Sequence, residues 1–179
     1  KDRGQKTSRN QDGKGHVWWV DSGATSTNAD IMEENKKMIA YEVIRTGAKS
    51  IESAQTILEN ILTKANLKKE DLSLIVSTGY GRVSIPYADE SVTEISCHGK
   101  GAHYFNPKIR TILDIGGQDS KAISLNEKGD VKDFVMNDKC AAGTGRFLEM
   151  MAKTLDIPIS ELGPLSLNWS ENIQITSMC

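Results

Sequence analysis

The stretch Leu113-Asp-Ile-Gly-Gly-Gln-Asp119 places an aspartate at the end of an apolar run and two glycines just after it. A similar order occurs 93 residues earlier, where an aspartate follows an apolar run in Val20-Asp-Ser-Gly-Ala-Thr25. Glycine lets the backbone turn tightly, and the N–H groups of such turns can point at an anion. The two turns therefore indicate a repeated α/β unit with one phosphate-binding turn in each copy.

The apolar spacing around these turns predicts the same order of elements in both copies. In the first copy we expect strands at 17–20, 26–32 and 38–44, a helix at 50–65 and a buried strand at 74–78. In the second copy we expect strands at 109–113, 121–125 and 131–136, then a helix from 143 or 144 to about 155. A further helix is expected between the copies, at 93–104. This order predicts two related lobes that face each other, the second of them incomplete.

The composition limits the classes of function. The 179 residues carry 22 basic and 24 acidic side chains, and the net charge is −2. This balance argues against nucleic acid or an anionic membrane as the main partner. No apolar run approaches the roughly 20 residues of a membrane span. Three cysteines, an odd number, do not make a disulfide framework, so we expect a reducing, cytoplasmic compartment.

The boundaries of the lobes follow from the same patterns. Residues 1–15 are polar, rich in glycine and basic residues, and without periodic apolar positions, so they predict a flexible linker or tail. The apolar pattern begins at His16. We therefore predict an N-terminal lobe over 16–108 and a partial C-terminal lobe over 109–179.

Both turns carry side chains that suit a phosphate and its metal ion. Asp21 can hold Mg²⁺ directly or through water, and the hydroxyl groups of residues 25–27 can donate to phosphate oxygens. After the second turn, the side chain of Gln118 can orient an attacking water molecule, with Asp119 next to it. An ordinary hairpin turn, capped by these polar side chains, is the alternative for either segment taken alone.

A single cysteine opens the glycine-spaced segment Asn137-Asp-Lys-Cys-Ala-Ala-Gly-Thr-Gly-Arg146. The N–H groups of the helix expected there favour a negatively charged group beside Cys140. Cys179 lies 39 residues later, after two residue types that often begin a helix. Two thiols are half of the four that a cubane iron–sulfur cluster needs. Their spacing matches no standard zinc or ferredoxin pattern, so two thiols without a metal remain the alternative.

Taken together with Ser77-Thr-Gly-Tyr-Gly-Arg82, these motifs resemble those of the 2-hydroxyacyl-CoA dehydratase activators. That family also includes the ATP-binding subunits of benzoyl-CoA reductase, within the acetate and sugar kinase, Hsp70 and actin superfamily. The resemblance runs from about Val17 to Cys179 and implies an actin-like (ribonuclease H-like) α/β ATPase fold. It also implies a complete first lobe and a truncated second lobe, because such relatives continue beyond the second cysteine with a Gly-rich adenosine-binding segment.

The resemblance further implies roles for individual residues. The nucleotide-binding residues would be Asp21, Gly23, Ala24, Thr25, Ser26, Gly116, Gly117 and Gln118. The catalytic residues would be Asp114 and Gln118, and the metal ligands would be Cys140 and Cys179. Four residues depart from the family pattern. Ser22 and Ala24 stand in the first turn, where family members often read Asp-Ile-Gly-Ser-Thr. Asn28 stands where a lysine is common, and Asp30 introduces a charge into the return strand.

The function implied by the resemblance is that of an ATP-dependent activator. With ATP and Mg²⁺, such a protein passes a low-potential electron from a [4Fe–4S] cluster to a 2-hydroxyacyl-CoA dehydratase. A homodimer would share the cluster, and a ferredoxin or flavodoxin would reduce it. The alternatives are an ATP-binding subunit of a benzoyl-CoA reductase-like enzyme, a cluster-free relative of the kinases, and a regulatory fragment without activity of its own.

Overall fold

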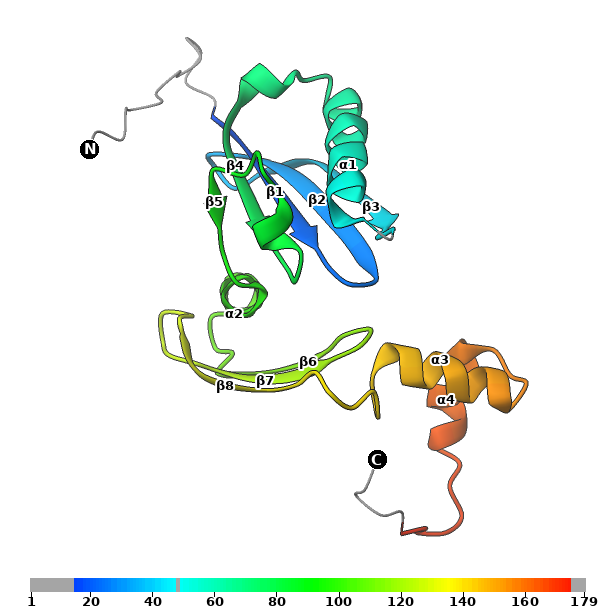
Figure 1. Ribbon diagram of the computed structural model, residues 1–179. Coiled ribbons are helices and arrows are strands. Elements are labelled where there is room, and N and C mark those ends of the chain that lie inside the picture. The colour runs from blue at the N-terminus through cyan, green and yellow to red at the C-terminus, as the bar shows by residue number, and fades with distance from the viewer. Residues whose placement is uncertain (1–14, 48, 175–179) are drawn as a thin grey trace. The chain divides into compact units, whose positions relative to one another are not determined.

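The computed structural model describes residues 15–47 and 49–174, which form two compact units that divide after His98 (Figure 1). All but the last residue of the predicted tail at 1–15 lies outside the described residues, and so does Cys179.

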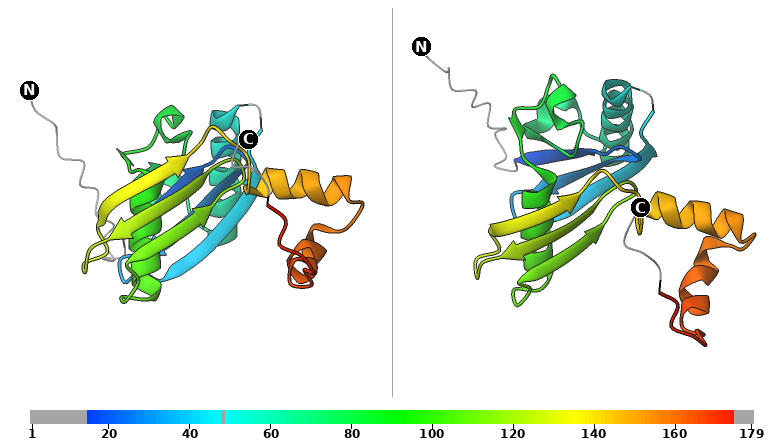
Figure 2. Two further views of the ribbon diagram at one scale, coloured as in Figure 1. Left: turned by 90° about the horizontal axis from the view of Figure 1, so that it is seen from below. Right: turned by 60° about the horizontal axis from the view of Figure 1, so that its bottom comes forward.

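The first unit is a five-stranded sheet with a helix packed on one face (Figure 1, Figure 2). Its strands, in the order β3-β2-β1-β4-β5, are β1 (His16–Ser22), β2 (Ser26–Glu33), β3 (Met38–Arg45), β4 (Leu72–Thr78) and β5 (Glu90–Ser91). β1 pairs antiparallel with β2 and parallel with β4. The covering helix is α1 (Ser50–Ala65), and two short 3-10 helices, η1 (Lys69–Asp71) and η2 (Arg82–Ser84), flank β4.

The core of this unit lies between the sheet and α1. Ile57, Leu58 and Ile61 recur at helical spacing on α1 and are at most 2% exposed. They belong to one buried cluster with the strand residues Trp18 and Ile31. Burying a side chain of this size is worth about 1.5–3 kcal/mol relative to leaving it exposed, so the apolar face of α1 holds the helix on the sheet.

The second unit contains a three-stranded antiparallel sheet in the order β6-β7-β8. Its strands are β6 (Thr111–Ile115), β7 (Ser120–Leu125) and β8 (Val131–Asn137). Before them α2 (Glu94–Phe105) spans the division of the chain, and after them come α3 (Gly145–Thr154) and α4 (Ile159–Ser166).

The strand ladders of the two units repeat one another at a constant offset. Asp21 faces Asn28 across β1 and β2, and Asp114 faces Lys121 across β6 and β7. Both members of the second pair lie 93 positions after those of the first. A register irregularity in β2 recurs in β7 at the same offset. The internal repeat expected from the sequence is thus confirmed.

The main differences from the sequence-based expectation concern the strand ends and short elements. Both turn aspartates lie inside their strands rather than after them, because Asp21 and Asp114 each keep a ladder partner on the neighbouring strand. β5 and α4 were not predicted. β5 has only two residues, and α4 has eight residues that include a glycine and a proline, both of which weaken a helical pattern.

The sheet face that α1 covers in the first unit has an open counterpart in the second. Val20 is fully buried, whereas Leu113, 93 residues later, is 76% exposed. Val135, in the same cross-strand row as Leu113, is 67% exposed. On the opposite face Ile123 and Leu125 are buried. Within the described part of the chain, the second sheet therefore buries one face only.

The departure at Asp30 has an energetic consequence. Asp30 lies in the middle of β2, and burial raises the pKa of its carboxyl group from 3.8 to about 6. A carboxyl whose pKa is higher in the folded state than in the unfolded state binds more protons when folded. The contribution of this group to the free energy of unfolding is therefore fully present below pH 3.8 and is lost as the pH rises through about 6.

We expect Asp30→Asn to stabilise the protein at neutral pH. The gain should be about 2 kcal/mol at pH 7.5, because the variant does not bury a charge, and it should vanish near pH 4. Urea unfolding at both pH values measures it. Glu70→Gln, which removes one negative charge at an exposed position of η1, serves as the control and should show no such pH dependence. A gain of equal size at both pH values would contradict the expectation.

Candidate functional site

The first turn is enclosed by residues 79–81, a glycine loop from a distant part of the sequence. Asp21 lies opposite Thr78 in the parallel β1–β4 pair, and Gly79 follows directly. Gly79 has a φ of +83°, and a Cβ atom at this position would lie 2.2 Å from Asp21 Oδ1. Gly81 donates its N–H to the carbonyl of Ser22 at 2.8 Å. Glycine is therefore required where this loop contacts the aspartate.

The predicted residues of the first turn lie together in the β1–β2 hairpin. Gly23 N donates to Ser26 O at 3.1 Å, which closes the turn over Ala24 and Thr25. Thr46, directly after β3, supports it by donating its hydroxyl to Gly23 O at 2.8 Å and its N–H to Thr25 O at 3.1 Å. The structure thus places Gly23, Ala24, Thr25 and Ser26 beside Asp21, with Ala24 exposed at the tip.

One expected phosphate donor is wrong. The side chain of Thr27 is fully buried, and its hydroxyl is hydrogen-bonded to that of Thr46 at 2.9 Å. Alternation along β2 turns Thr27 into the core. The buried hydroxyl of Ser22, in contrast, has no hydrogen-bond partner in the described part of the chain, and it lies under Gly81.

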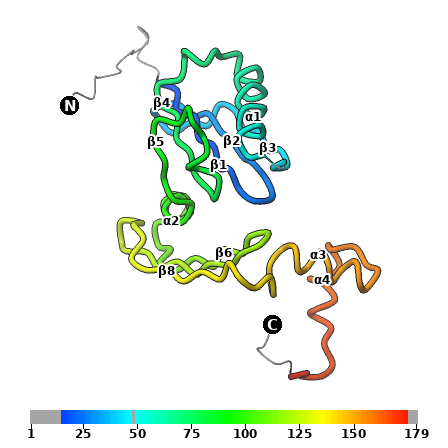
Figure 3. The backbone as a smooth tube through the Cα atoms, in the orientation of Figure 1, coloured from blue at the N-terminus to red at the C-terminus, as the bar shows by residue number. Residues whose placement is uncertain are grey.

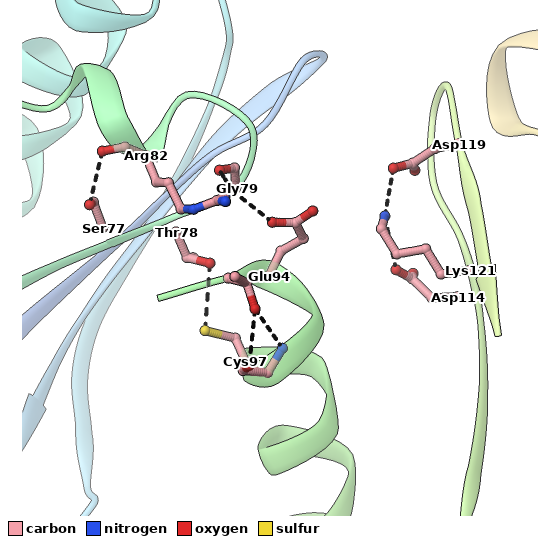
Figure 4. A network of polar contacts seen from close by, with 11 residues as sticks. Ser77, Thr78, Gly79, Arg82, Glu94, Cys97, Asp114, Asp119 and Lys121 are labelled. Atoms are coloured by element: carbon pink, nitrogen blue, oxygen red, sulfur yellow. Dashed lines mark hydrogen bonds and ion pairs between the residues drawn. The ribbon is translucent and has the colours of Figure 1, made fainter. Parts of the chain in front are cut away.

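An ion pair fastens the glycine loop to α2 (Figure 4). Arg82 Nη1 donates to Gly79 O at 2.9 Å and contacts Glu94 Oε2 at 3.2 Å, and both side chains are largely buried. On the same helix Cys97 Sγ donates to Thr78 Oγ1 at 3.5 Å. Burial raises the pKa of the Cys97 thiol, which fits a small packing residue rather than a reactive thiolate.

The second turn holds a buried lysine between two carboxylates (Figure 4). Lys121 Nζ lies 2.6 Å from Asp119 Oδ2 and 3.6 Å from Asp114 Oδ2, and its side chain is 5% exposed. Gly116 N donates to Asp119 O at 2.9 Å, so the turn closes as the first one does. Gln118 is exposed at its tip. A charged residue within the apolar alternation of β7 was the available signal for Lys121, and sequence reasoning missed it.

The cysteine segment joins the same turn. Asn137 at the end of β8 accepts the N–H of Cys140 at 3.1 Å and donates its amide to Cys140 O at 3.2 Å. At the far end of the segment, Gly145 N donates to Gly116 O and Arg146 N to Gly117 O, both at 2.9 Å. The segment therefore begins at β8 and ends on the second turn, where α3 starts (Figure 3).

The described residues contain one thiol at this place and no cluster of three or more His, Cys, Asp or Glu side chains suited to a metal ion. Residues 141–143 are small, and a Cβ atom on Gly143 would meet nothing within 4 Å. Cys140 can supply one thiolate ligand at this place. A four-thiolate cluster would need ligands from outside the described residues.

No helix in the described ranges is long and apolar enough to cross a membrane.

The sequence matches one family of known proteins and several of its members. The profile of the BadF/BadG/BcrA/BcrD ATPase family matches residues 20–179. The activator of lactoyl-CoA dehydratase from Anaerotignum propionicum is 46% identical over 160 residues, covering 89% of this chain and 61% of the activator. A subunit of the benzoyl-CoA reductase from Thauera aromatica is 34% identical over 126 residues, which are 70% of this chain and 44% of that protein.

Two solved structures are similar over most of the chain. Component A of the (R)-2-hydroxyglutaryl-CoA dehydratase from Acidaminococcus fermentans superposes with a TM-score of 0.81 at 37% identity, over 92% of this chain and 63% of that one. The activator of the 2-hydroxyisocaproyl-CoA dehydratase from Clostridium difficile, solved with ADPNP bound, superposes with a TM-score of 0.78 at 40% identity. The match covers 92% of this chain and 61% of that one. The chain spans about three fifths of the length of the curated dehydratase activators that it matches.

Proposed function

The chain belongs to the BadF/BadG/BcrA/BcrD ATPase family and has the actin-like α/β fold of its activators, and from this we propose that it is the ATP-binding part of a 2-hydroxyacyl-CoA dehydratase activator. The observation that carries the proposal is the pair of turns 93 residues apart, each with an aspartate beside closely packed glycines. A relative with 40% identity binds an ATP analogue, which supports the nucleotide as ligand.

In this proposal each turn has a defined task. Asp21 in the first turn and Asp114 in the second would each offer a carboxylate to Mg²⁺, directly or through water. The N–H groups of residues 24–25 and 117 would bind phosphate oxygens, since those of Gly23 and Gly116 close the turns. Gln118, exposed at the tip of the second turn, orients the water molecule that attacks the terminal phosphorus. Asp114 would take part in catalysis by holding the metal ion.

Electron transfer is the second part of the proposal. Cys140 and Cys179 would bind a [4Fe–4S] cluster together with the same two cysteines of a second copy, so that a homodimer is required. Such a cluster supplies the single low-potential electron for the dehydratase after reduction by a ferredoxin or flavodoxin. Cys140 is hydrogen-bonded to Asn137 at the end of β8 and lies in the segment whose far end is bonded to the second turn, which supports coupling between nucleotide and cluster.

The activator is favoured over a reductase subunit by sequence identity, since dehydratase activators match at 40–46% and the reductase subunit at 34%. If the chain were a cluster-free relative of the kinases, the segment that contains Cys140 would have no assigned function. A cytoplasmic location remains a prediction.

We expect the chain to bind ADPNP with Mg²⁺, and Asp21→Asn and Asp114→Asn to weaken binding at least about tenfold each. A charge-assisted contact to the metal is worth about 1.5–3 kcal/mol, and each 1.4 kcal/mol is a factor of ten. Isothermal titration calorimetry measures the affinity. Asp133→Asn, at an exposed position of β8, is the control and should bind like the wild type. A wild-type chain that binds no nucleotide would overturn the proposal.

A further inference from the structure

We propose that Lys121 is a positioning residue of the nucleotide site, whose ammonium group holds the second turn in the shape that anchors α3, the helix that follows Cys140. The inference rests on the proposed nucleotide-binding role of that turn. It adds a task for a residue that neither binds nucleotide nor ligates metal in the proposed function.

The Lys121 side chain is almost fully buried, so its ammonium group depends on the two aspartates beside it. A lysine side chain that is 5% exposed must have its charge compensated, because an unpaired ammonium group is costly away from water. Asp119 takes the closer contact, at 2.6 Å, and Asp114 the longer one, at 3.6 Å. The lysine is therefore bound tightly to the aspartate after the turn and loosely to the aspartate before it.

Asp119 connects Lys121 to the glycines of the second turn. Its backbone carbonyl accepts the N–H of Gly116 at 2.9 Å. Its carboxylate lies so close to Gly116 that a Cβ atom there would come within 2.3 Å of Oδ1. The carboxylate that binds Lys121 is therefore packed directly on the backbone of the turn.

The carbonyl groups of the turn then hold the start of α3. The first N–H groups of a helix have no partner inside the helix. In α3 the first two, those of Gly145 and Arg146, donate to Gly116 O and Gly117 O. An unbroken series of contacts thus leads from the Lys121 ammonium group through Asp119 and the glycines to the helix.

The internal repeat argues that the hairpin itself does not need this lysine. At the equivalent place in the first unit, Asn28 faces Asp21, and the antiparallel ladder forms with the same register. The helix that follows the third strand of the first unit is α1, and it packs on the sheet of that unit. Lysine at 121 therefore matches the added task of the second turn.

The test replaces Lys121 by the residue of the other repeat. Amide hydrogen exchange, followed by NMR in the nucleotide-free chain, reports on Gly145 and Arg146 directly. We expect Lys121→Asn to accelerate exchange of these two amides about tenfold or more, since each is protected by a single contact to the turn. Lys100→Asn is the control, because Lys100 forms an exposed ion pair with Asp130 in the same unit and should leave both amides unchanged.

A second variant keeps the test valid if Lys121→Asn does not fold. Asp119→Asn retains the shape of the side chain and leaves Lys121 beside Asp114, and it should accelerate the same two amides. The double variant should exchange no faster than the quicker single variant, because both substitutions break one series of contacts. Unchanged exchange at Gly145 and Arg146 in Asp119→Asn, or fully additive effects in the double variant, would overturn the proposal.

The two proposals fail separately. If the wild type binds no Mg²⁺–ADPNP, the proposed function fails, and the exchange rates of the nucleotide-free chain still test the contact series. If the wild type binds Mg²⁺–ADPNP but Lys121→Asn leaves exchange at Gly145 and Arg146 unchanged, the positioning role fails and the proposed function stands.

Discussion

Replacing Gly79 by alanine is expected to abolish nucleotide binding and to destabilise the first unit. A non-glycine residue in the left-handed region costs about 1–2 kcal/mol, and forced overpacking adds roughly 1–3 kcal/mol. At Gly79 both apply, because φ is +83° and the added Cβ atom would lie 2.2 Å from Asp21 Oδ1 and 2.7 Å from Ser22 O. We therefore expect a loss of about 2–5 kcal/mol in the free energy of unfolding, measured by urea denaturation.

The control for this prediction is a glycine with space around it. A Cβ atom on Gly101, inside α2, would meet nothing within 4 Å, so Gly101→Ala should stabilise the helix by up to about 1 kcal/mol. Affinity for Mg²⁺–ADPNP should fall below detection in Gly79→Ala, because Asp21 must move, and should be unchanged in Gly101→Ala. If Gly79→Ala bound nucleotide normally, the glycine loop would have no part in the site.

Cys140→Ser is expected to remove all iron from the anaerobically reconstituted protein. A cubane cluster shared by two copies would give about four irons per dimer in the wild type. A serine hydroxyl is a poor ligand for such a cluster, so Cys140→Ser and Cys179→Ser should each be colourless and lose the dimer. Iron analysis together with size-exclusion chromatography, both under anaerobic conditions, measures the two effects.

Cys97→Ser is the matched control for the loss of iron. Cys97 is half-buried and bonded to Thr78, and burial raises the pKa of its thiol, so it should not ligate iron. Its substitution should leave the iron content unchanged. A colourless monomeric wild type would remove the electron-transfer part of the proposal and leave an ATP-binding chain of the same fold.

Much of the fold followed from local patterns. The helix predicted at 50–65 is α1 with the same bounds, because its apolar residues repeat at helical spacing and face a single sheet. The strands around both turns were also predicted, since each alternates or is bounded by glycine and polar residues. α4 was missed because eight residues with an internal proline carry little helical signal.

The candidate site was predicted only in part. The repeat located Asp21, Asp114 and the glycines after them, because chain neighbours in a turn remain neighbours in space. Contacts between distant segments have no such signal. Nothing near Gly79 in the sequence indicates that it lies against Asp21, since the parallel pairing of β1 with β4 brings them together.

The sequence by itself therefore determined the family, the repeated hairpins and the residues of each turn, all of which depend on short-range spacing. Only the tertiary structure decided which groups neutralise the charges of those turns and which side chains pack against them. Thr27 turned out to be a core residue, and Lys121 became the cation between two carboxylates. The physical reason is that burial and charge pairing depend on what packs against a residue, and strands bring together positions that the sequence keeps apart.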